Sequence, residues 1–424
     1  MSFDTISVIG LGYIGLPTAA MFASRKKKVI GVDVNQHAVD TINKGKIHIV
    51  EPELDMLVHA AVTESYLKAT ITPQPADAFL IAVPTPFLPT VNEGDIPKPD
   101  LKYIESAAKA IAPVLKKGDL VILESTSPVG ATEQMAEWLA QARTDLTFPQ
   151  TNGEESDVRI AHCPERVLPG HVVRELVEND RVIGGLTNKC SEAAVELYKT
   201  FVKGDCVITN ARTAEMAKLT ENSCRDVQIA FANELSIICD KLDIDVWELI
   251  SLANRHPRIN ILQPGPGVGG HCIAVDPWFI VAKTPEHAKL IHSARKVNDS
   301  KPQWVIDKVK IAISDFLQAN PNKLAKEVTI ACYGLAFKPD IDDLRESPAK
   351  KIVQLISGFH SGTVMVVEPN IKALGDEFNS NIVLHDINSS VTNADIAVYL
   401  VKHKEFNRDS LFLNNSFIID AVGI

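Results

Sequence analysis

The feature that most constrains the fold of this chain is a glycine pattern near its N-terminus. The pattern reads G-x-G-x-x-G, and its residues include Gly10, Gly12, Tyr13, Ile14 and Gly15. It lies between an apolar run that predicts a strand and an apolar segment that predicts a helix. Asp33 ends the next apolar run. The arrangement predicts a βαβ unit whose glycine turn admits a dinucleotide pyrophosphate, while Asp33 accepts a hydrogen bond from a ribose 2′-hydroxyl.

The residue after Asp33 indicates which dinucleotide fits. No arginine stands there, and the Asp33 carboxylate would repel a 2′-phosphate. The sequence therefore favours NAD over NADP as the cofactor. An ordinary glycine turn is the alternative interpretation, and the strand, the helix and the acidic residue in register argue against it.

Two later turns follow predicted strands at 78–83 and 120–124. Ligands of parallel sheets bind at the carboxyl ends of the strands, so these turns are candidates for cofactor contact. The candidate residues are Pro84, Thr85, Ser125 and Thr126. Purely structural proline turns explain them equally well.

The order of apolar patterns along the chain predicts an α/β fold. Predicted strands cover 5–10, 28–33, 78–83, 120–124 and 158–162, with amphipathic segments between them, as in a parallel sheet covered by helices. A helical period then predicts one long central helix through Met216, Leu219, Val227, Phe231, Leu235, Ile238 and Leu242. After a polar linker at 320–323, strands return at 327–334, 363–368, 394–401 and 417–420, with a helix at 347–358. We expect two Rossmann-like domains, 1–205 and 319–424, joined by a long central helix and a helical domain, 206–318.

The two αβ regions also resemble each other weakly. Residues 7–12 are similar to 330–335, and residues 31–35 are similar to 366–370, but only the first copy keeps the full glycine pattern. The repeat predicts a cofactor in one half and a nucleotide-bearing substrate in the other.

Composition excludes several classes of protein. The formal charge of -10 disfavours nucleic acid or an anionic membrane as the main partner. Seven cysteines without paired spacing predict reduced thiols and no metal site. The N-terminus lacks a basic region, and no apolar run reaches the roughly 18 residues of a spanning helix. We therefore expect a cytoplasmic protein.

A cysteine in a glycine-rich loop suggests the chemistry. Cys272 follows Gly269 in the segment 267–276, and Asp276 comes four residues after it. A thiolate adds to an aldehyde to give a thiohemiacetal, which can lose a hydride and leave as a carboxylate. Beside a hydride acceptor, Cys272 therefore indicates oxidation from alcohol to acid. The alternative is a small buried hydrophobic side chain.

Polar residues elsewhere are compatible with this chemistry. Lys218 and Asn222 lie four residues apart on the predicted central helix, with Arg225 beyond them. An ammonium there could stabilise a developing alkoxide, although a solvated polar stripe is the commoner outcome. Glu165 follows a predicted strand and is either a general base or an ion-pair partner.

Taken together, ordered motifs over almost the whole chain resemble the UDP-sugar 6-dehydrogenase family. They are the segments 10–17, 83–86, 124–130, 164–166, Lys218 with Asn222, the Cys272 loop, 334–339 and 343–349. The resemblance implies an NAD domain, a helical centre that forms a dimer and a UDP-binding domain. It also implies a four-electron oxidation at C6 that uses two NAD⁺ and water, for a bacterial surface polysaccharide of the enterobacterial common antigen type.

The resemblance also assigns roles to residues. Cys272 is the nucleophile, Lys218, Asn222 and Asp276 act at the C6 oxygen or on water, and Glu165 assists thioester hydrolysis. The substrate-binding residues that it implies are Glu165, Arg166, Val167, Lys218, Asn222, Arg258, Gly269 and Lys338. Arg345 is assigned to the cofactor, and Arg258 to a neighbouring subunit's site.

The sugar is less constrained than the reaction. Arg166 and Val167 after Glu165, together with the loop 264–273, are similar to the branch that oxidises UDP-N-acetylhexosamines. Overall resemblance favours the manno epimer, with UDP-N-acetylglucosamine as the nearest alternative. A two-electron hydroxyacid or phosphogluconate dehydrogenase and a non-catalytic nucleotide-sugar sensor are the alternatives from other classes.

Overall fold

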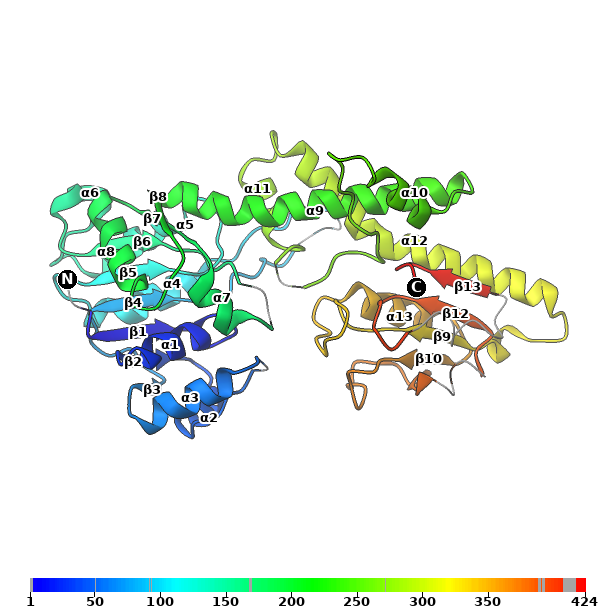
Figure 1. Ribbon diagram of the computed structural model, residues 1–424, viewed down its shortest axis with the longest axis horizontal. Helices are drawn as coiled ribbons and strands as arrows, with labels where there is room; N and C mark the ends of the chain where they lie inside the picture. Colours follow the sequence, from blue (N-terminus) through cyan, green and yellow to red (C-terminus); the bar gives the residue numbers. More distant parts are fainter. Residues whose placement is uncertain are drawn as a thin grey trace. The chain divides into compact units, whose positions relative to one another are not determined.

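The computed structural model of the chain describes residues 3–49, 51–90, 92, 94–167, 170–270, 272–387, 390, 393–406 and 417–424. The chain forms two compact units. Unit 1 comprises Met1–Glu221 with Ala282–Pro285, and unit 2 comprises Asn222–Val281 with Glu286–Ile424. Each contains its own sheet (Figure 1).

Unit 1 is built on an eight-stranded sheet of order β3-β2-β1-β4-β5-β6-β7-β8. Its strands are β1 (Thr5–Ile9), β2 (Lys28–Val32), β3 (Leu67–Thr70), β4 (Ala78–Ile81), β5 (Leu120–Leu123), β6 (Arg159–His162), β7 (Arg181–Gly185) and β8 (Cys206–Asn210). Neighbours are parallel except β6 and β7, which pair antiparallel. The predicted parallel sheet is therefore mixed at this one junction.

Helices cover both faces of this sheet. They are α1 (Gly15–Ser24), α2 (Gln36–Asn43), α3 (Leu54–Thr63), α4 (Lys102–Ile111), α5 (Ala131–Ala142), α6 (Pro149–Asn152), α7 (Val172–Glu178) and α8 (Asn188–Tyr198). Side chains of a strand alternate between faces, so Ala78 and Leu80 enter one apolar core while Phe79 and Ile81 enter the other. Burial on both sides explains the nearly continuous apolar runs that predict these strands.

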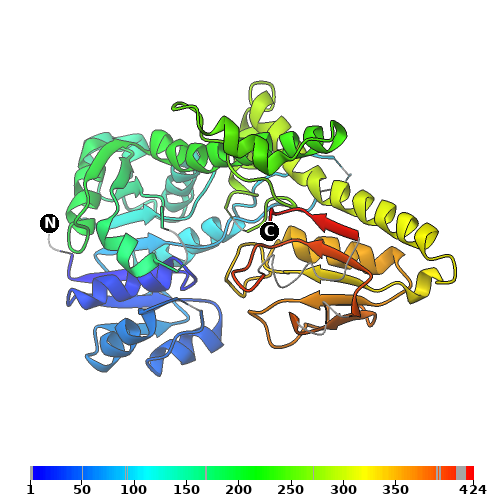
Figure 2. The same cartoon turned by 45° about the vertical axis from the view of Figure 1, so that its right-hand side comes forward.

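Unit 2 combines helices with a five-stranded parallel sheet of order β11-β10-β9-β12-β13. The strands are β9 (Ile330–Tyr333), β10 (Val364–Val367), β11 (Ile382–Leu384), β12 (Ile396–Tyr399) and β13 (Phe417–Asp420). The helices are α9 (Ala211–Lys241), which begins in unit 1, and α10 (Val246–Ala253), α11 (Asp276–Lys283), α12 (Lys289–Ala319) and α13 (Pro348–Phe359). Both α12 and α13 pack on this sheet (Figure 2).

Two Rossmann-like sheets and a long central helix confirm the predicted fold class. The linker prediction also agrees with the structure, because α12 ends at Ala319, directly before residues 320–323. The exact boundaries 1–205, 206–318 and 319–424 stay a prediction. Among the residues that the structure describes, no helix is long and apolar enough to cross a membrane.

Candidate active site

The glycine turn after β1 has the geometry that a dinucleotide needs. Gly10 has a φ of +91°, and a Cβ atom there would lie 2.5 Å from the carbonyl oxygen of Ala82. Beside Gly12, in contrast, there is open space for at least 4 Å. The turn is therefore closed on its inner side and open on the side where a pyrophosphate would approach the start of α1.

Asp33, directly after β2, is oriented by this same turn. One carboxylate oxygen accepts the Leu11 amide at 2.8 Å, and the other accepts the Asn35 amide at 2.8 Å. The residue is only half-buried, and each oxygen keeps a further lone pair. Asp33 can thus accept hydrogen bonds from ribose hydroxyls, as the sequence predicts, and this chain fits NAD.

The turns after β4 and β5 are hydrogen-bonded to each other. The Thr85 hydroxyl donates to the Thr126 carbonyl at 2.6 Å, and the Ser125 hydroxyl donates to the Val83 carbonyl at 2.7 Å. The structure therefore brings two predicted cofactor segments together at one edge of the sheet. It also gives both hydroxyls a structural task, and their contact with the cofactor stays a prediction.

Glu165, which follows β6, lies in a buried ion pair. One carboxylate oxygen accepts from the Arg181 guanidinium at 2.6 Å, and the other accepts the Arg166 amide at 2.7 Å. Burial, together with the charge of Glu165, raises the pKa of the neighbouring Glu124 to about 7. The ion-pair interpretation of Glu165 is thus realised in the structure, and its role in hydrolysis stays a prediction.

Three further predicted residues also belong to unit 1. Arg166 forms an ion pair with Glu221 at 2.5 Å, and Val167 packs partly buried against the core. Lys218 is half-buried on α9, one turn before Asn222. Arg166 is therefore held by a carboxylate on α9 rather than extended into solvent.

Cys272 is exposed and lies four residues before Asp276, where α11 begins. Its carbonyl oxygen accepts the amides of Val275 and Asp276 at 3.0 and 2.9 Å, so a helical turn separates the thiol from the Asp276 carboxylate. Asp276 is buried and accepts from the Asn222 side-chain amide at 2.5 Å. The structure thereby joins three predicted catalytic residues in unit 2.

The loop before Cys272 is held by a buried network between α9 and α12. The side-chain oxygen of Asn233 accepts the Gly265 amide at 2.9 Å, and its side-chain amide donates to Asn298 at 2.9 Å. Asn298 donates to Asp226 at 2.8 Å, and Arg295 pairs with Asp226 at 2.6 Å. These polar groups fix where the loop leaves the helices.

Further along, the loop touches the segment that follows β9. A Cβ atom on Gly269 would lie 2.5 Å from the Glu346 carbonyl oxygen and 2.9 Å from Cβ of Phe337. Only glycine allows so close an approach. The close contact with this segment requires glycine at position 269. The substrate role predicted for Gly269 stays a prediction.

The remaining predicted residues are exposed cations. Lys338 lies in the segment after β9, and Arg258 follows α10. Arg345 forms an ion pair with Asp343 at 2.6 Å. The sequence reasoning missed Arg181, Asn233 and Phe337, because their importance comes from contacts between distant segments that no local pattern encodes.

The fold and the two sites define the class of the protein. A dinucleotide turn with an acidic ribose acceptor indicates an NAD-dependent dehydrogenase. An exposed thiol lies one helical turn from a hydrogen-bonded carboxylate, a pair of groups that alcohol oxidation alone does not require.

Family models support the same class. The model described as "UDP-glucose/GDP-mannose dehydrogenase family, NAD binding domain" matches residues 4–202. The central-domain model of that family matches 212–300, and its UDP binding domain matches 331–424. The chain belongs to the UDP-glucose/GDP-mannose dehydrogenase family, and its cofactor is NAD.

Individual relatives cover the chain from end to end. A UDP-N-acetyl-D-mannosamine dehydrogenase of Yersinia pestis is 65% identical, with 100% of both chains covered. An NDP-N-acetyl-D-galactosaminuronic acid dehydrogenase of Ralstonia nicotianae is 64% identical, with 100% of this chain and 97% of the relative covered. The solved UDP-D-ManNAc dehydrogenase of Pyrococcus horikoshii is 39% identical with a TM-score of 0.85, and the match covers 99% of this chain and 95% of the other.

Proposed function

We propose that this protein oxidises UDP-N-acetyl-D-mannosamine at C6 to the uronate, with two NAD⁺ and water. The observation that carries the proposal is the exposed Cys272 thiol, one helical turn from an Asp276 carboxylate that is itself held by Asn222. The balance is one primary alcohol, two NAD⁺ and one water in, and one carboxylate, two NADH and three protons out.

Bound NAD supplies a hydride acceptor twice in this reaction. Lys218 stabilises the C6 oxygen as it loses its proton, since an ammonium lowers the energy of an alkoxide. After the first oxidation, the Cys272 thiolate adds to the aldehyde carbon, and the resulting thiohemiacetal keeps the intermediate on the enzyme while the cofactor is exchanged. Loss of a second hydride leaves a thioester on Cys272.

Hydrolysis completes the reaction. Water attacks the thioester carbon, the carbon–sulfur bond breaks, and the thiol of Cys272 is regenerated. Asp276 is assigned to orient this water, because Asn222 fixes its carboxylate. Glu165 assists hydrolysis electrostatically, since Arg181 holds it in place.

Several residues are assigned to binding of the nucleotide sugar. Lys338 and Arg258 are exposed cations that suit a diphosphate. Gly269 is assigned to the substrate as well. Arg166 and Val167, which directly follow Glu165, are assigned to the sugar. Arg345 is assigned to the cofactor.

The choice of sugar draws on named relatives. The Yersinia and Pyrococcus relatives are named for UDP-N-acetylmannosamine, but the Ralstonia relative, named for an N-acetylgalactosaminuronic acid product, is nearly as similar to this chain. Identity alone does not separate these epimers. The manno epimer is the proposal, and the galacto and gluco epimers are the candidates to test against it.

The test is NADH formation with purified protein and four substrates: UDP-glucose and the UDP-N-acetyl derivatives of mannosamine, galactosamine and glucosamine. The proposal predicts the highest kcat/KM for the mannosamine derivative and two NADH per sugar consumed. A preference for another sugar would correct the substrate. One NADH per substrate would instead indicate a two-electron dehydrogenase, and no NADH with any UDP-sugar would indicate a sensor.

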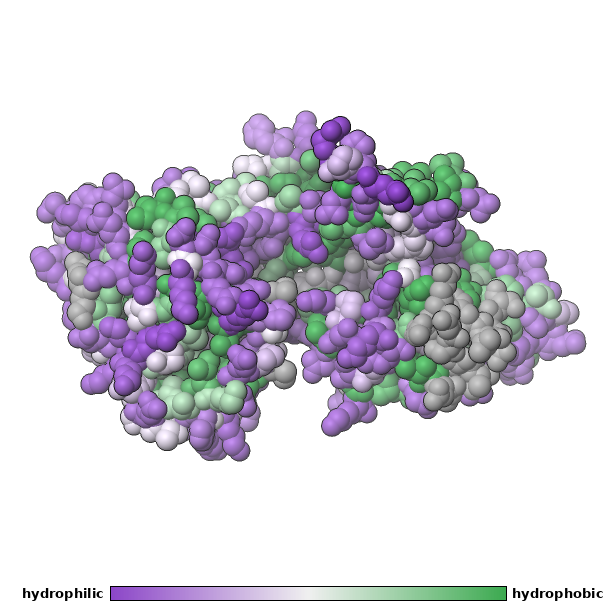
Figure 3. All heavy atoms as spheres, viewed as in Figure 1, coloured by the Kyte–Doolittle hydropathy of each residue, from purple (hydrophilic) through white to green (hydrophobic). Residues whose placement is uncertain are grey.

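We also infer a homodimer built on α9. The inward face of this helix buries polar residues such as Ser223 and Asn233 together with apolar ones such as Leu219, whereas Phe231 and Ile238 on its outer face are 51% and 46% exposed. Apolar atoms also gather over the end of α9 and over α10, where Leu242 and Leu252 are exposed (Figure 3). Such a face is expected to be covered by a second copy. The expected mass by light scattering is twice 46.3 kDa.

The setting of the reaction follows from its product. A UDP-linked uronate is a precursor for acidic polysaccharide, and we propose that the chain supplies a bacterial surface polymer from the cytoplasm. Loss of the uronic acid from surface polysaccharide after deletion of the gene is the expected result, and unchanged polymer would contradict it.

A further inference from the structure

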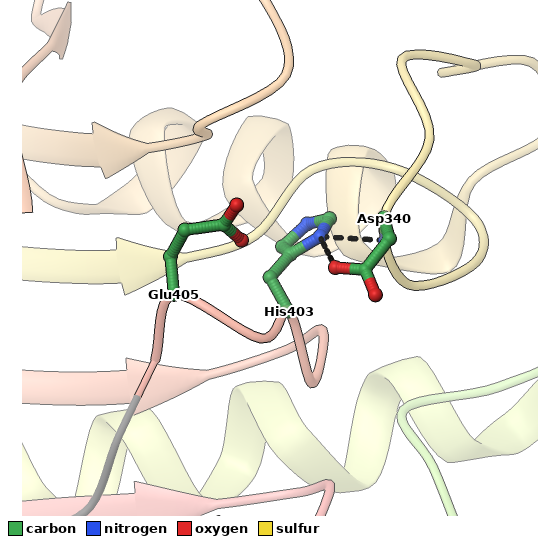
Figure 4. A group of neighbouring side chains, drawn as sticks. All are labelled: Asp340, His403 and Glu405. Atoms are coloured by element: carbon green, nitrogen blue, oxygen red, sulfur yellow. Dashed lines mark hydrogen bonds and ion pairs between the residues drawn. The ribbon is translucent and has the colours of Figure 1, made fainter.

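A buried histidine after β12 contacts the segments that follow β9 and β10 in the UDP-binding domain. His403 is 1% exposed. Its Nδ1 accepts the backbone amide of Asp340 at 2.9 Å, and its Nε2 lies 3.0 Å from a carboxylate oxygen of Glu368 (Figure 4 shows the Asp340 side of this contact). Because Nδ1 accepts, Nε2 carries the proton and donates to Glu368.

Glu368 in turn holds the start of the segment that follows β9. The same oxygen that faces His403 accepts the amides of Leu335 and Ala336 at 2.8 and 3.1 Å. Burial alone would raise the pKa of Glu368, but the hydrogen bonds from His403 and the backbone amides lower it to about 2. The carboxylate is therefore charged, and it depends on these donors for its place in the core.

The segment 335–340 is thus held at its two ends by two side chains that bond each other. Glu368 holds its start, and His403 holds Asp340 at its end, where a φ of 61° would otherwise be unfavourable. The Lys404 amide adds a bond to the Asp340 carboxylate at 3.1 Å. Phe337 and Lys338 lie between these anchor points.

Phe337 carries the restraint to the loop of the thiol. Cβ atoms placed on Gly269 and Gly270 would lie 2.9 and 3.1 Å from Phe337, so this side chain is in close contact with both residues. Cys272 follows two positions after Gly270. The chain of contacts runs from His403 through the 335–340 segment to the backbone beside the nucleophile.

A comparison within the chain shows what is special about this position. Ile9 pairs with Val32 and Ile81 in unit 1, and Tyr333 pairs with Val367 and Tyr399 in unit 2. By this register Glu368 corresponds to Asp33, and His403 corresponds to Thr85. Asp33 is half-buried and open to a ribose, whereas His403 covers Glu368, which is 3% exposed. Both carboxylates accept the equivalent loop amide, of Leu11 and of Leu335, and the second copy differs in the histidine that covers its carboxylate.

A metal ion is the other conceivable task for this histidine. Possible ligand atoms of Asp340, His403 and Glu405 lie within 4.8 Å of one another (Figure 4). The Nδ1 lone pair of His403 already accepts the Asp340 amide, however, and Asp340 and Glu405 are partly exposed to water. The geometry favours a hydrogen-bonded anchor over a metal ligand.

We propose that His403 is a positioning residue, which fixes the 335–340 segment so that Lys338 meets the substrate diphosphate and Phe337 supports the backbone before Cys272. The inference rests on the proposed function only in assigning the UDP moiety to Lys338. Its consequences for binding and for loop order are independent of turnover.

The test uses the full-length variant His403→Phe, which keeps a ring against Phe406 and removes the hydrogen bonds of the imidazole to Asp340, Asn370 and Glu368. UDP affinity, measured by calorimetry without cofactor, is expected to fall roughly tenfold, the effect of one lost hydrogen bond network on a binding loop. Amide hydrogen exchange is expected to rise in peptides covering 264–270 and 335–340, and to stay unchanged around Gly10. The variant His403→Gln, which can still donate to Glu368, is expected to recover part of both effects.

His360→Phe is the matched control. His360 is also buried in this domain and contacts the Val328 carbonyl oxygen at 2.8 Å, before β9 and therefore at the opposite edge of the sheet. It should lower the melting temperature without changing UDP affinity. Equal UDP affinity in His403→Phe and His360→Phe, or unchanged exchange at 264–270, would overturn the proposal. If His403→Phe does not fold, His403→Gln against His360→Gln decides the same question. UDP binding without NADH formation in the wild type would reject the proposed function and leave this comparison intact.

Discussion

Glu124 is a buried carboxyl group whose pKa is raised to about 7 by burial and by the charge of Glu165. The ordinary value is 4.5, so between these two pH values the unfolded chain has released a proton that the folded chain retains. Stability is therefore lost as the pH rises through this window. Glu124, the first residue of the motif 124–130, therefore lowers the stability of the fold at neutral pH.

Replacing Glu124 by glutamine should remove this pH dependence. Glutamine keeps an oxygen that can accept from Tyr198, which donates to Glu124 at 2.6 Å. The free energy of unfolding of Glu124→Gln, relative to the wild type, is expected to rise by about 3 kcal/mol from pH 4 to pH 8. Urea titrations at several pH values measure this difference. A difference that does not change with pH would show that Glu124 titrates normally.

Asp33 is predicted to set the cofactor preference. Asp33→Asn removes the charge that repels a 2′-phosphate and weakens the acceptor for the ribose. The KM for NAD is expected to rise about tenfold, and the preference for NAD over NADP to fall. Asp40→Asn, an exposed residue on α2, removes an equal charge and should change neither value. If Asp33→Asn prefers NAD over NADP as strongly as the wild type does, another residue sets the cofactor preference.

The sequence singles out residues of the candidate site where the pattern that marks them lies within one segment of the chain. The pattern around Gly10, the spacing from Cys272 to Asp276 and the position of Asn222 on a helix are all local. The tasks of Phe337 and His403 come from contacts between strands far apart in the sequence, and no local pattern predicts them. The ion pair of Glu165 similarly required Arg181, which belongs to another strand.

At the scale of elements, burial explains which strands the sequence revealed. The predicted strands at β1, β2, β4, β5 and β6 agree with the structure to within two residues, because both faces of each are covered by helices. The strands β3 and β8 contain exposed or polar positions and were missed. The antiparallel β7 was also missed, since its two glycines interrupt the apolar pattern.

A buried network of polar contacts joins the helix pair α9 and α12. Asn298 is buried and bonds both Asn233 and Asp226. Asn298→Ala leaves the Asn233 side-chain amide without this acceptor and removes one donor from Asp226, which keeps Arg295. We expect a loss of about 2–3 kcal/mol in the free energy of unfolding. Gln303→Ala, an exposed position on the same helix, should cost less than about 0.5 kcal/mol. Equal effects in urea titrations would contradict a structural role for the network.

At the scale of the whole molecule, the apolar residues predicted on the central helix include both buried and exposed side chains. Leu219 is buried, but Phe231, Ile238 and Leu242 are exposed in the single chain. A helical period alone does not tell whether an apolar face meets the chain's own core or a second copy.

The variant Phe231→Glu with Ile238→Glu should therefore give a monomer, because it places charges where the two copies would meet. Light scattering measures the mass, and Leu355→Glu, at an exposed apolar position on α13, is the control that should leave it unchanged. A wild-type protein that is already a monomer would contradict the proposed assembly.

The central claim is that Cys272 carries the intermediate of a four-electron oxidation, and a single-turnover experiment with enzyme in excess over UDP-N-acetylmannosamine tests it most directly. NADH is followed by absorbance and uronate by chromatography. The wild type and Cys224→Ser, which changes another exposed cysteine, should form two NADH and one uronate per sugar. Cys272→Ser should form uronate at least about a thousandfold more slowly. Two NADH and free uronate at the wild-type rate from Cys272→Ser would contradict the account.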